Sequence, residues 1–176
     1  SSVVPYHWDD RDKLSKDYNY IISLYEKILT ELHYELNRFH SVSYSKKYWE
    51  ALIGYWLGYF IQVCFDRFSM LKIAFEIYGK LDYITFDRDP FLCVANDTHD
   101  FIPKPLSDDY NEALYAQIIK LYYSENVNIK TVNHILRSES SSKRTQLSNP
   151  NFINRFLNKI GDKFNLVKLK KNIIKS

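Results

Sequence analysis

The chain has 176 residues, of which 45% are hydrophobic and 26% charged, a size and composition that fit one globular domain with a core that needs no disulfide or metal. Its 15 Tyr and 11 Phe beside only 4 Gly predict a mainly helical protein whose interior is built from aromatic rings. Cys64 and Cys93 lack the spacing of a disulfide framework or a zinc site, so we interpret both as small core residues in a reducing compartment.

The net charge of +3 conceals an asymmetry along the chain. Residues 1–125 carry 13 basic and 19 acidic residues, a net charge of −6, whereas residues 126–176 carry 11 basic and 2 acidic residues, a net charge of +9. Such a basic segment is typical of binding to anionic lipid, nucleic acid, a phosphate-bearing substrate or an acidic face of the same protein. No aromatic interleaving or nucleic-acid-binding motif accompanies the charge, so a solvated or intramolecularly docked helix is favoured and nucleic acid is the weakest partner.

A first amphipathic helix is predicted from Asp17, which we take as its N-cap, to about His40. A second is predicted from Lys46 to Tyr78, with Gly79 as its stop.

The segment "YWEALIGYWLGYFIQVCFDRF", residues 48–68, is nearly as apolar as a membrane span. Glu50, Gln62 and Asp66 interrupt it, so we interpret it instead as the central helix of a bundle. Gly54 and Gly58 form a small-xxx-small pair that admits a neighbouring helix closely.

The segments "YITF" and "FLCVA" predict two short strands near 82–95. Helices follow from about Asp109 to Tyr123 and from Ile129 to Leu136. The expected fold is therefore mainly α, a helical bundle around a long apolar central helix with a small α/β-like insertion. We expect a helical domain over 1–138, a Ser-rich linker over 139–150 and a basic helical tail over 151–176.

Several enzymatic signatures do not occur in the sequence. It has no glycine-rich phosphate loop, no zinc-type Cys and His spacing and no serine elbow, and we expect neither a cofactor nor a metal. No secretory leader precedes Pro5, and "SSVVPYHW" resembles a cut into a longer protein, so we expect a cytoplasmic location.

The stretch "HWDDRD" crowds together an imidazole, an indole, carboxylates and a guanidinium. This mixture suits a sugar or a phosphate, because rings stack on a pyranose while carboxylates accept from its hydroxyls. The alternative is the start of a helix with a Trp anchor and a solvated acidic face, which we favour. The candidate substrate-binding and catalytic residues here are His7, Trp8, Asp9, Asp10 and Arg11.

The stretch "LNRFH" places Asn37 and His40 three residues apart on one helical face. His33 and His40 lie two turns apart, and either pair is a candidate for a cleft. A helix-ending histidine that binds the last carbonyls is the favoured interpretation. Within the apolar segment, Trp49 and Trp56 are mostly core residues whose indole N–H groups need partners.

Asp66 and Arg67 directly follow the apolar run. Ionic groups at the end of a buried helix are candidates for a site, with a structural ion pair as the alternative. In "NDTHD", His99 between Asp97 and Asp100 is a candidate base, but a turn with Asx-type hydrogen bonds explains the same residues and is narrowly favoured.

Taken in order, "PYHWDDRDKLSKDYNYIISLYEKIL", "ELNRFH", "YWEALIGYWLGYFIQVCFDRF" and the stretch from "NDTHDF" to "DDYNEALYAQII" resemble a bacterial family of transferases of surface-carbohydrate assembly. The resemblance spans about Pro5 to Ile119. It implies a longer protein, with sequence before "PYHWDDR" and a large carboxyl-terminal part similar to a two-lobed glycosyltransferase. It carries over no catalytic residue, and Tyr55 stands where the family pattern has a proline, which implies a straighter helix here.

The resemblance implies a helical part of a cytoplasmic glycosyltransferase-like enzyme at the inner face of the membrane. Its partners are then a nucleotide sugar, a glycan acceptor and the rest of the full-length polypeptide. Arg11 and Arg67 are the expected cations for the leaving phosphate, with Asp9, Asp66 or His40 as the base. The alternative is a noncatalytic helical module that binds a partner protein or an anionic membrane surface through its basic tail.

Overall fold

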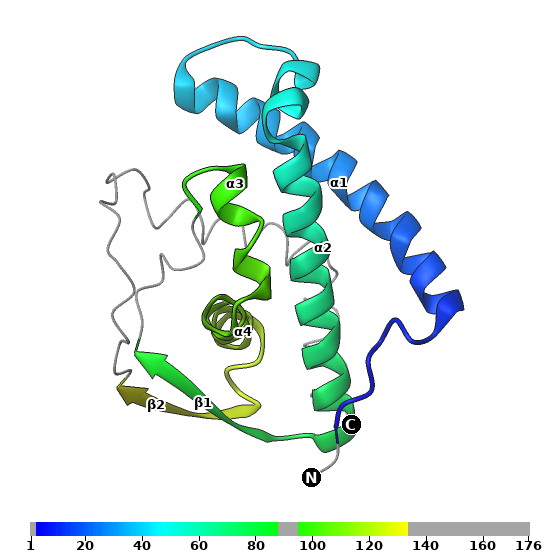
Figure 1. Cartoon of the computed structure of the whole chain (residues 1–176), viewed down its shortest axis with the longest axis vertical. Coiled ribbons are helices and arrows are strands. Elements are labelled where there is room, and N and C mark those ends of the chain that lie inside the picture. Colours follow the sequence, from blue (N-terminus) through cyan, green and yellow to red (C-terminus); the bar gives the residue numbers. More distant parts are fainter. Residues whose placement is uncertain (1–2, 88–94, 134–176) are drawn as a thin grey trace.

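The computed structural model describes residues 3–87 and 95–133. Within these residues the order of elements is α1 (Arg11–His40), α2 (Lys46–Tyr78), β1 (Leu81–Asp87), α3 (Thr98–Phe101), the 3₁₀ helix η2 (Lys104–Leu106), α4 (Asp108–Tyr122) and β2 (Val127–Asn133). The mainly helical class is confirmed. In Figure 1, α1 crosses one end of α2 obliquely, and the two strands lie toward the other end of α2.

Helix α1 begins earlier than the sequence predicts. The Asp10 carboxylate accepts hydrogen bonds from the backbone N–H groups of Asp12 and Lys13, at 2.9 and 3.0 Å, so Asp10 is the N-cap. The prediction that Asp17 caps this helix is therefore wrong, and Asp17 lies within its second turn. The predicted end at His40 is confirmed.

Helix α2 has the predicted bounds. The Ser45 side chain accepts from the backbone N–H of Tyr48, and Gly79 ends the helix with a φ of 68°, a conformation that favours glycine. A Cβ added at Gly54 would lie 2.7 Å from the hydroxyl of Tyr25 on α1, and one added at Gly58 would lie 3.9 Å from the same ring. The two glycines thus admit α1 closely, as predicted.

The hydrophobic core lies where α2 packs against α1, α3 and α4. Its most deeply buried large side chains are Leu29, Leu57, Ile61, Phe101, Leu114 and Ile119. The first half of α2 is not enclosed on all sides, because Tyr48, Leu52 and Tyr55 are exposed.

The two strands pair in parallel, with Leu81 opposite Val127 and Asp87 opposite Asn133. The predicted helix from Ile129 to Leu136 is therefore wrong over the described residues, where the alternating, β-branched sequence "VNIKTVN" forms β2. Glu112 of α4 fixes β1, since its carboxylate accepts from the Thr85 hydroxyl at 2.8 Å and the Phe86 N–H at 3.3 Å.

Three expectations fall outside the described residues. The first strand near 82–95 is confirmed as β1, but most of "FLCVA" lies in 88–94. The Ser-rich linker and the basic tail lie in 134–176. In the described part of the chain, no helix combines the length and apolar character needed to cross a bilayer.

Candidate functional site

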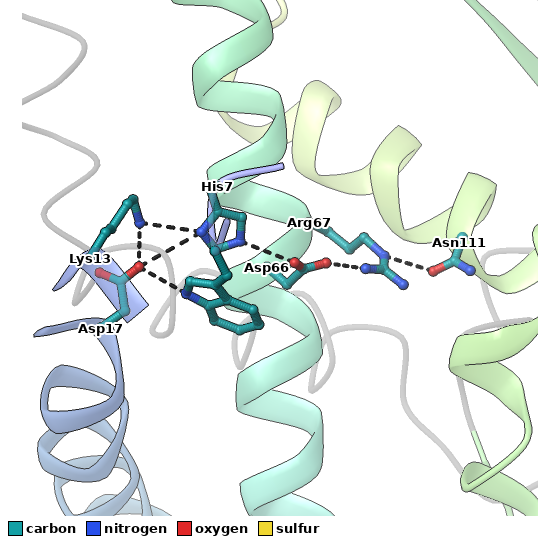
Figure 2. Close-up of polar contacts among 7 residues, drawn as sticks. His7, Lys13, Asp17, Asp66, Arg67 and Asn111 are labelled. Atoms are coloured by element: carbon teal, nitrogen blue, oxygen red, sulfur yellow. Dashed lines mark hydrogen bonds and ion pairs between the residues drawn. The ribbon is translucent and has the colours of Figure 1, made fainter. Parts of the chain in front are cut away.

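A continuous series of polar contacts joins the amino-terminal segment to three helices (Figure 2). His7, on the segment before α1, contacts the Asp66 carboxylate of α2 through Nε2, at 3.0 Å. Asp66 also binds Arg67 Nη1 through its second oxygen. Arg67 Nε in turn donates to Asn111 Oδ1 of α4 at 2.9 Å. We call these residues, with Lys13 and Asp17 described next, the Asp66 network.

On the other side of His7, the network reaches the first turns of α1. Lys13 Nζ lies 3.2 Å from His7 Nδ1 and also contacts the Asp17 carboxylate. Trp8 Nε1 donates to the same Asp17 oxygen at 3.1 Å, and the Trp8 ring stacks on Phe65 of α2 at 6.2 Å. Asp17 therefore orients two residues of the amino-terminal segment at once.

These contacts assign the hydrogen on the His7 ring. A lysine ammonium has only donors, so Nδ1 must accept from Lys13. Nε2 then carries the hydrogen that is donated to Asp66, an assignment made from its partners. Nδ1 also lies 3.7 Å from the Asp17 carboxylate. The ring is thereby fixed by one donor and one acceptor.

Arg67 is engaged by protein acceptors in three directions. Besides Asp66 and Asn111, its Nη2 donates to the carbonyl of Pro105 at 3.5 Å. The Asn111 amide is held in turn by the carbonyls of Pro105 and Ser107, both at 2.9 Å. With three of its five N–H groups used in this way, Arg67 fixes α2 against α4 and the turn before it.

Two tyrosines border the Asp66 network. Partial burial and the neighbouring Asp66 carboxylate, which accepts from its hydroxyl, raise the pKa of Tyr6 to about 12. Burial also raises the pKa of Tyr115, with Asp66 acting in the same direction and Arg67 against it. Both phenols stay protonated at neutral pH, and the Tyr6 hydroxyl donates to Asp66.

The residues at the centre of the Asp66 network are buried, whereas neighbouring residues of the amino-terminal segment are exposed. The His7 side chain is 0% exposed and that of Asp66 is 7% exposed, so neither presents its polar atoms to a ligand in solution. Tyr6, Asp9 and Arg11 are exposed beside them. The arrangement is thus a buried ionic scaffold under an exposed segment that carries a phenol, a carboxylate and a guanidinium.

The candidates Asn37, His40 and Trp49 form a second cluster at the other end of α1. Asn37 Oδ1 accepts from Trp49 Nε1 at 2.8 Å and from the Tyr44 N–H at 3.1 Å, while its Nδ2 donates to the Tyr44 carbonyl at 2.8 Å. His40 stacks on Trp49 with ring centroids 5.7 Å apart. These contacts stabilise the connection between α1 and α2.

The two clusters are far apart. At a rise of 1.5 Å per residue, His40 lies about 45 Å along α1 from Arg11, and Trp49 lies about 25 Å along α2 from Asp66. Trp56 belongs to neither cluster, since it stacks on Phe60 at 5.3 Å and meets Phe101 at 6.2 Å. The structure therefore brings His7, Trp8, Asp66 and Arg67 together and separates them from the other aromatic candidates.

In "NDTHD", the two carboxylates accept hydrogen bonds from backbone N–H groups. Asp97 caps α3 by accepting from the Asp100 N–H at 2.8 Å, and Asp100 accepts from the Asn96 N–H at 2.9 Å. The backbone hydrogen bond from Asn96 and the nearby Lys104 ammonium lower the pKa of Asp100. The carboxylates thus make structural hydrogen bonds, as the favoured interpretation expects, but they cap the short helix α3 and do not form an Asx turn.

Sequence reasoning missed the partners that complete the Asp66 network. Lys13, Asp17 and Asn111 were not candidates, and Asn111 lies 44 residues from Arg67. The spacing of Lys13 and Asp17, four residues apart on a helix, is a local signal for an ion pair once the helix is known to begin at Arg11. Among residues 3–87 and 95–133, no group of three or more His, Cys, Asp or Glu side chains is arranged to hold a metal ion.

Comparison with known proteins adds one assignment. No curated protein and no solved structure matches the chain significantly. The whole chain, residues 1–176, matches the family described as LIC12162 family transferase. The chain therefore belongs to the LIC12162 family of transferases.

Proposed function

We propose that this chain is part of a glycosyltransferase-like enzyme that transfers an activated sugar to a surface-glycan acceptor. Membership of a transferase family supports the reaction class. The observation that carries the substrate class is the exposed segment over the Asp66 network. Within six residues it offers the Tyr6 ring, the Asp9 carboxylate and the Arg11 guanidinium, all on exposed residues.

These groups suit the two halves of a nucleotide sugar. An aromatic face and a carboxylate bind a sugar ring through stacking and through its hydroxyls. A guanidinium binds phosphate oxygens with paired N–H groups. The Tyr6 hydroxyl donates to the buried Asp66 carboxylate, which fixes the ring for stacking.

In the proposed reaction, a carboxylate takes the proton from the acceptor hydroxyl. The hydroxyl oxygen then forms a bond to the anomeric carbon, and the bond from that carbon to the nucleotide phosphate breaks. Asp9 is the base in this proposal because its carboxylate is exposed, whereas Asp66 is buried. Arg11 neutralises the leaving phosphate, and His7, Asp66 and Arg67 act as positioning residues.

His40 has no role in this proposal, since it lies at the opposite end of α1. The nucleotide sugar, the glycan acceptor and the rest of the full-length polypeptide are the proposed partners. A cytoplasmic location at the inner face of the membrane is proposed with them, because nucleotide sugars are made inside the cell.

Ligand binding by this chain tests the donor half of the proposal. The chain is titrated with nucleoside mono- and diphosphates and with their sugars while its melting temperature is followed. A ligand that binds only the folded state raises that temperature. Arg11→Gln is expected to weaken the bound phosphate ligand about tenfold or more, while Lys16→Gln, an exposed cation on the same helix, keeps wild-type affinity.

The catalytic half is tested by transfer assays on the complete protein. Asp9→Asn is expected to lower kcat about 100-fold or more, which is the usual contribution of a general base. Asp12→Asn removes a neighbouring exposed carboxylate and is expected to retain wild-type kcat. Equal rates for Asp9→Asn and wild type would exclude Asp9 as the base.

A further inference from the structure

The connection between α1 and α2 presents aromatic rings to solvent. We call residues 38–48 the hairpin tip. Phe39 is 74% exposed, Tyr44 is 46% exposed and Tyr48 is 42% exposed. In Figure 1 this connection projects at one end of the molecule, beyond α3, α4 and the two strands. The exposed rings therefore lie on a protrusion and not on a face that α3 or α4 covers.

The hairpin tip also differs in charge from the rest of the helical part. It contains Arg38, Lys46 and Lys47 and no carboxylate, although residues 1–125 as a whole carry a net charge of −6. Arg38 pairs with Glu35 and Lys46 with Glu26, each at 2.5 Å, at the base of the tip. Exposed pairs of this kind contribute little to stability. Lys47 is exposed next to them and carries the charge argument for an anionic partner.

The rings are held in place from beneath. The Asn37 amide fixes both the Tyr44 backbone and the Trp49 indole, and the Tyr44 and Tyr48 rings lie with their centroids 4.2 Å apart. Trp49 itself is buried, 7% exposed. A partner that meets these rings therefore meets a preorganised surface, and little ordering entropy opposes binding.

We infer that the hairpin tip binds the surface of an anionic lipid bilayer. Aromatic rings with one polar edge favour the interface between headgroups and acyl chains, and Lys and Arg beside them favour anionic headgroups. Because the tip projects beyond α3, α4 and the two strands, it meets a bilayer surface before those elements do. This site is separate from the basic tail, and it would hold the enzyme beside a lipid-linked acceptor.

Cosedimentation of the full chain with vesicles tests this inference. The vesicles contain phosphatidylcholine with phosphatidylserine, or phosphatidylcholine alone. Phe39→Ser is expected to weaken binding to the anionic vesicles about tenfold, and Lys47→Gln about fivefold. The matched controls are Leu106→Ser and Lys80→Gln, which remove an apolar side chain 81% exposed and an exposed lysine away from the tip.

A second readout separates the tip from the basic tail, which could itself bind anionic lipid. In a Phe39→Trp variant, the added indole is expected to shift its emission to shorter wavelength with anionic vesicles and to be quenched by brominated lipid, whereas Leu106→Trp is not. The inference is overturned if the chain binds no anionic vesicles. It is equally overturned if binding persists unchanged in Phe39→Ser and Lys47→Gln while the Phe39→Trp signal does not respond.

Discussion

Replacing Asp66 by asparagine changes one charge at the centre of the network without changing its shape. The Asp66 carboxylate accepts from His7 Nε2 and from Arg67 Nη1 on its two oxygens. In Asp66→Asn one of these oxygens becomes an NH₂ group, which faces a donor and cannot accept. One buried donor is then left without its acceptor.

The cost follows from the type of contact. A hydrogen bond to a charged group contributes about 1.5–3 kcal/mol, and breaking a buried ion pair costs about 3–5 kcal/mol. The Arg67 side chain is 23% exposed, so water compensates it in part. We therefore expect Asp66→Asn to lower the free energy of unfolding by about 2–3 kcal/mol, a large share of the stability of a typical domain.

Urea unfolding measures this cost, and limited proteolysis shows where it acts. Because Asp66 holds His7, Asp66→Asn is expected to speed cleavage within residues 3–10 more than cleavage elsewhere. The matched control is Asp82→Asn, an exposed carboxylate that accepts from Asn128 at 3.0 Å and should cost under about 0.5 kcal/mol. Equal stability for Asp66→Asn and Asp82→Asn would refute this reasoning.

Three further predictions concern packing, pH and the second cluster. Gly58→Ala is expected to raise the free energy of unfolding by about 0.5–1 kcal/mol in thermal melts, whereas Gly54→Ala gains less or loses stability because the Tyr25 hydroxyl must move. Tyr6 has a folded pKa of about 12, above its unfolded value of 10.0, so it stabilises the fold below pH 10 and loses that effect as pH rises toward 12. Tyr6→Phe should therefore lose stability less steeply over this interval in urea titrations. Asn37→Ala is expected to cost about 1–3 kcal/mol in urea unfolding, since it leaves a backbone N–H and an indole N–H without their acceptor; a cost near zero would mean that these donors find water.

The helical class and the bounds of α2 follow from sequence because the signals are local. The apolar run, the Ser45 cap and the Gly79 stop all lie within or next to the helix they define. The start of α1 was mispredicted because Asp10 and Asp17 are both plausible caps. In the structure Asp10 accepts from the N–H groups of Asp12 and Lys13, while Asp17 accepts from the Trp8 indole. The β2 strand was mispredicted because its pairing with β1 spans 46 residues of sequence.

The proximity of some candidate residues was predictable from sequence for the same reason. His7, Trp8, Asp66 and Arg67 stood out as unusual residues next to apolar sequence, and the structure joins them. Their grouping with Asn37 and Trp49 did not follow, because a long helix separates the two ends of the hairpin. Asn111 carries no sequence signal at all, since a single asparagine near a helix start is ordinary.

The central claim is that the buried Asp66 network positions an exposed segment that binds the nucleotide sugar. Calorimetric titration of the nucleotide sugar identified by the melting experiment, into wild type and Asp66→Asn at a temperature where both are folded, tests it most directly. The account predicts about tenfold weaker binding to Asp66→Asn, although the Asp66 side chain is only 7% exposed. The reason is that the segment carrying Tyr6 and Arg11 is no longer fixed in position through His7. Equal affinity in the two proteins would contradict it.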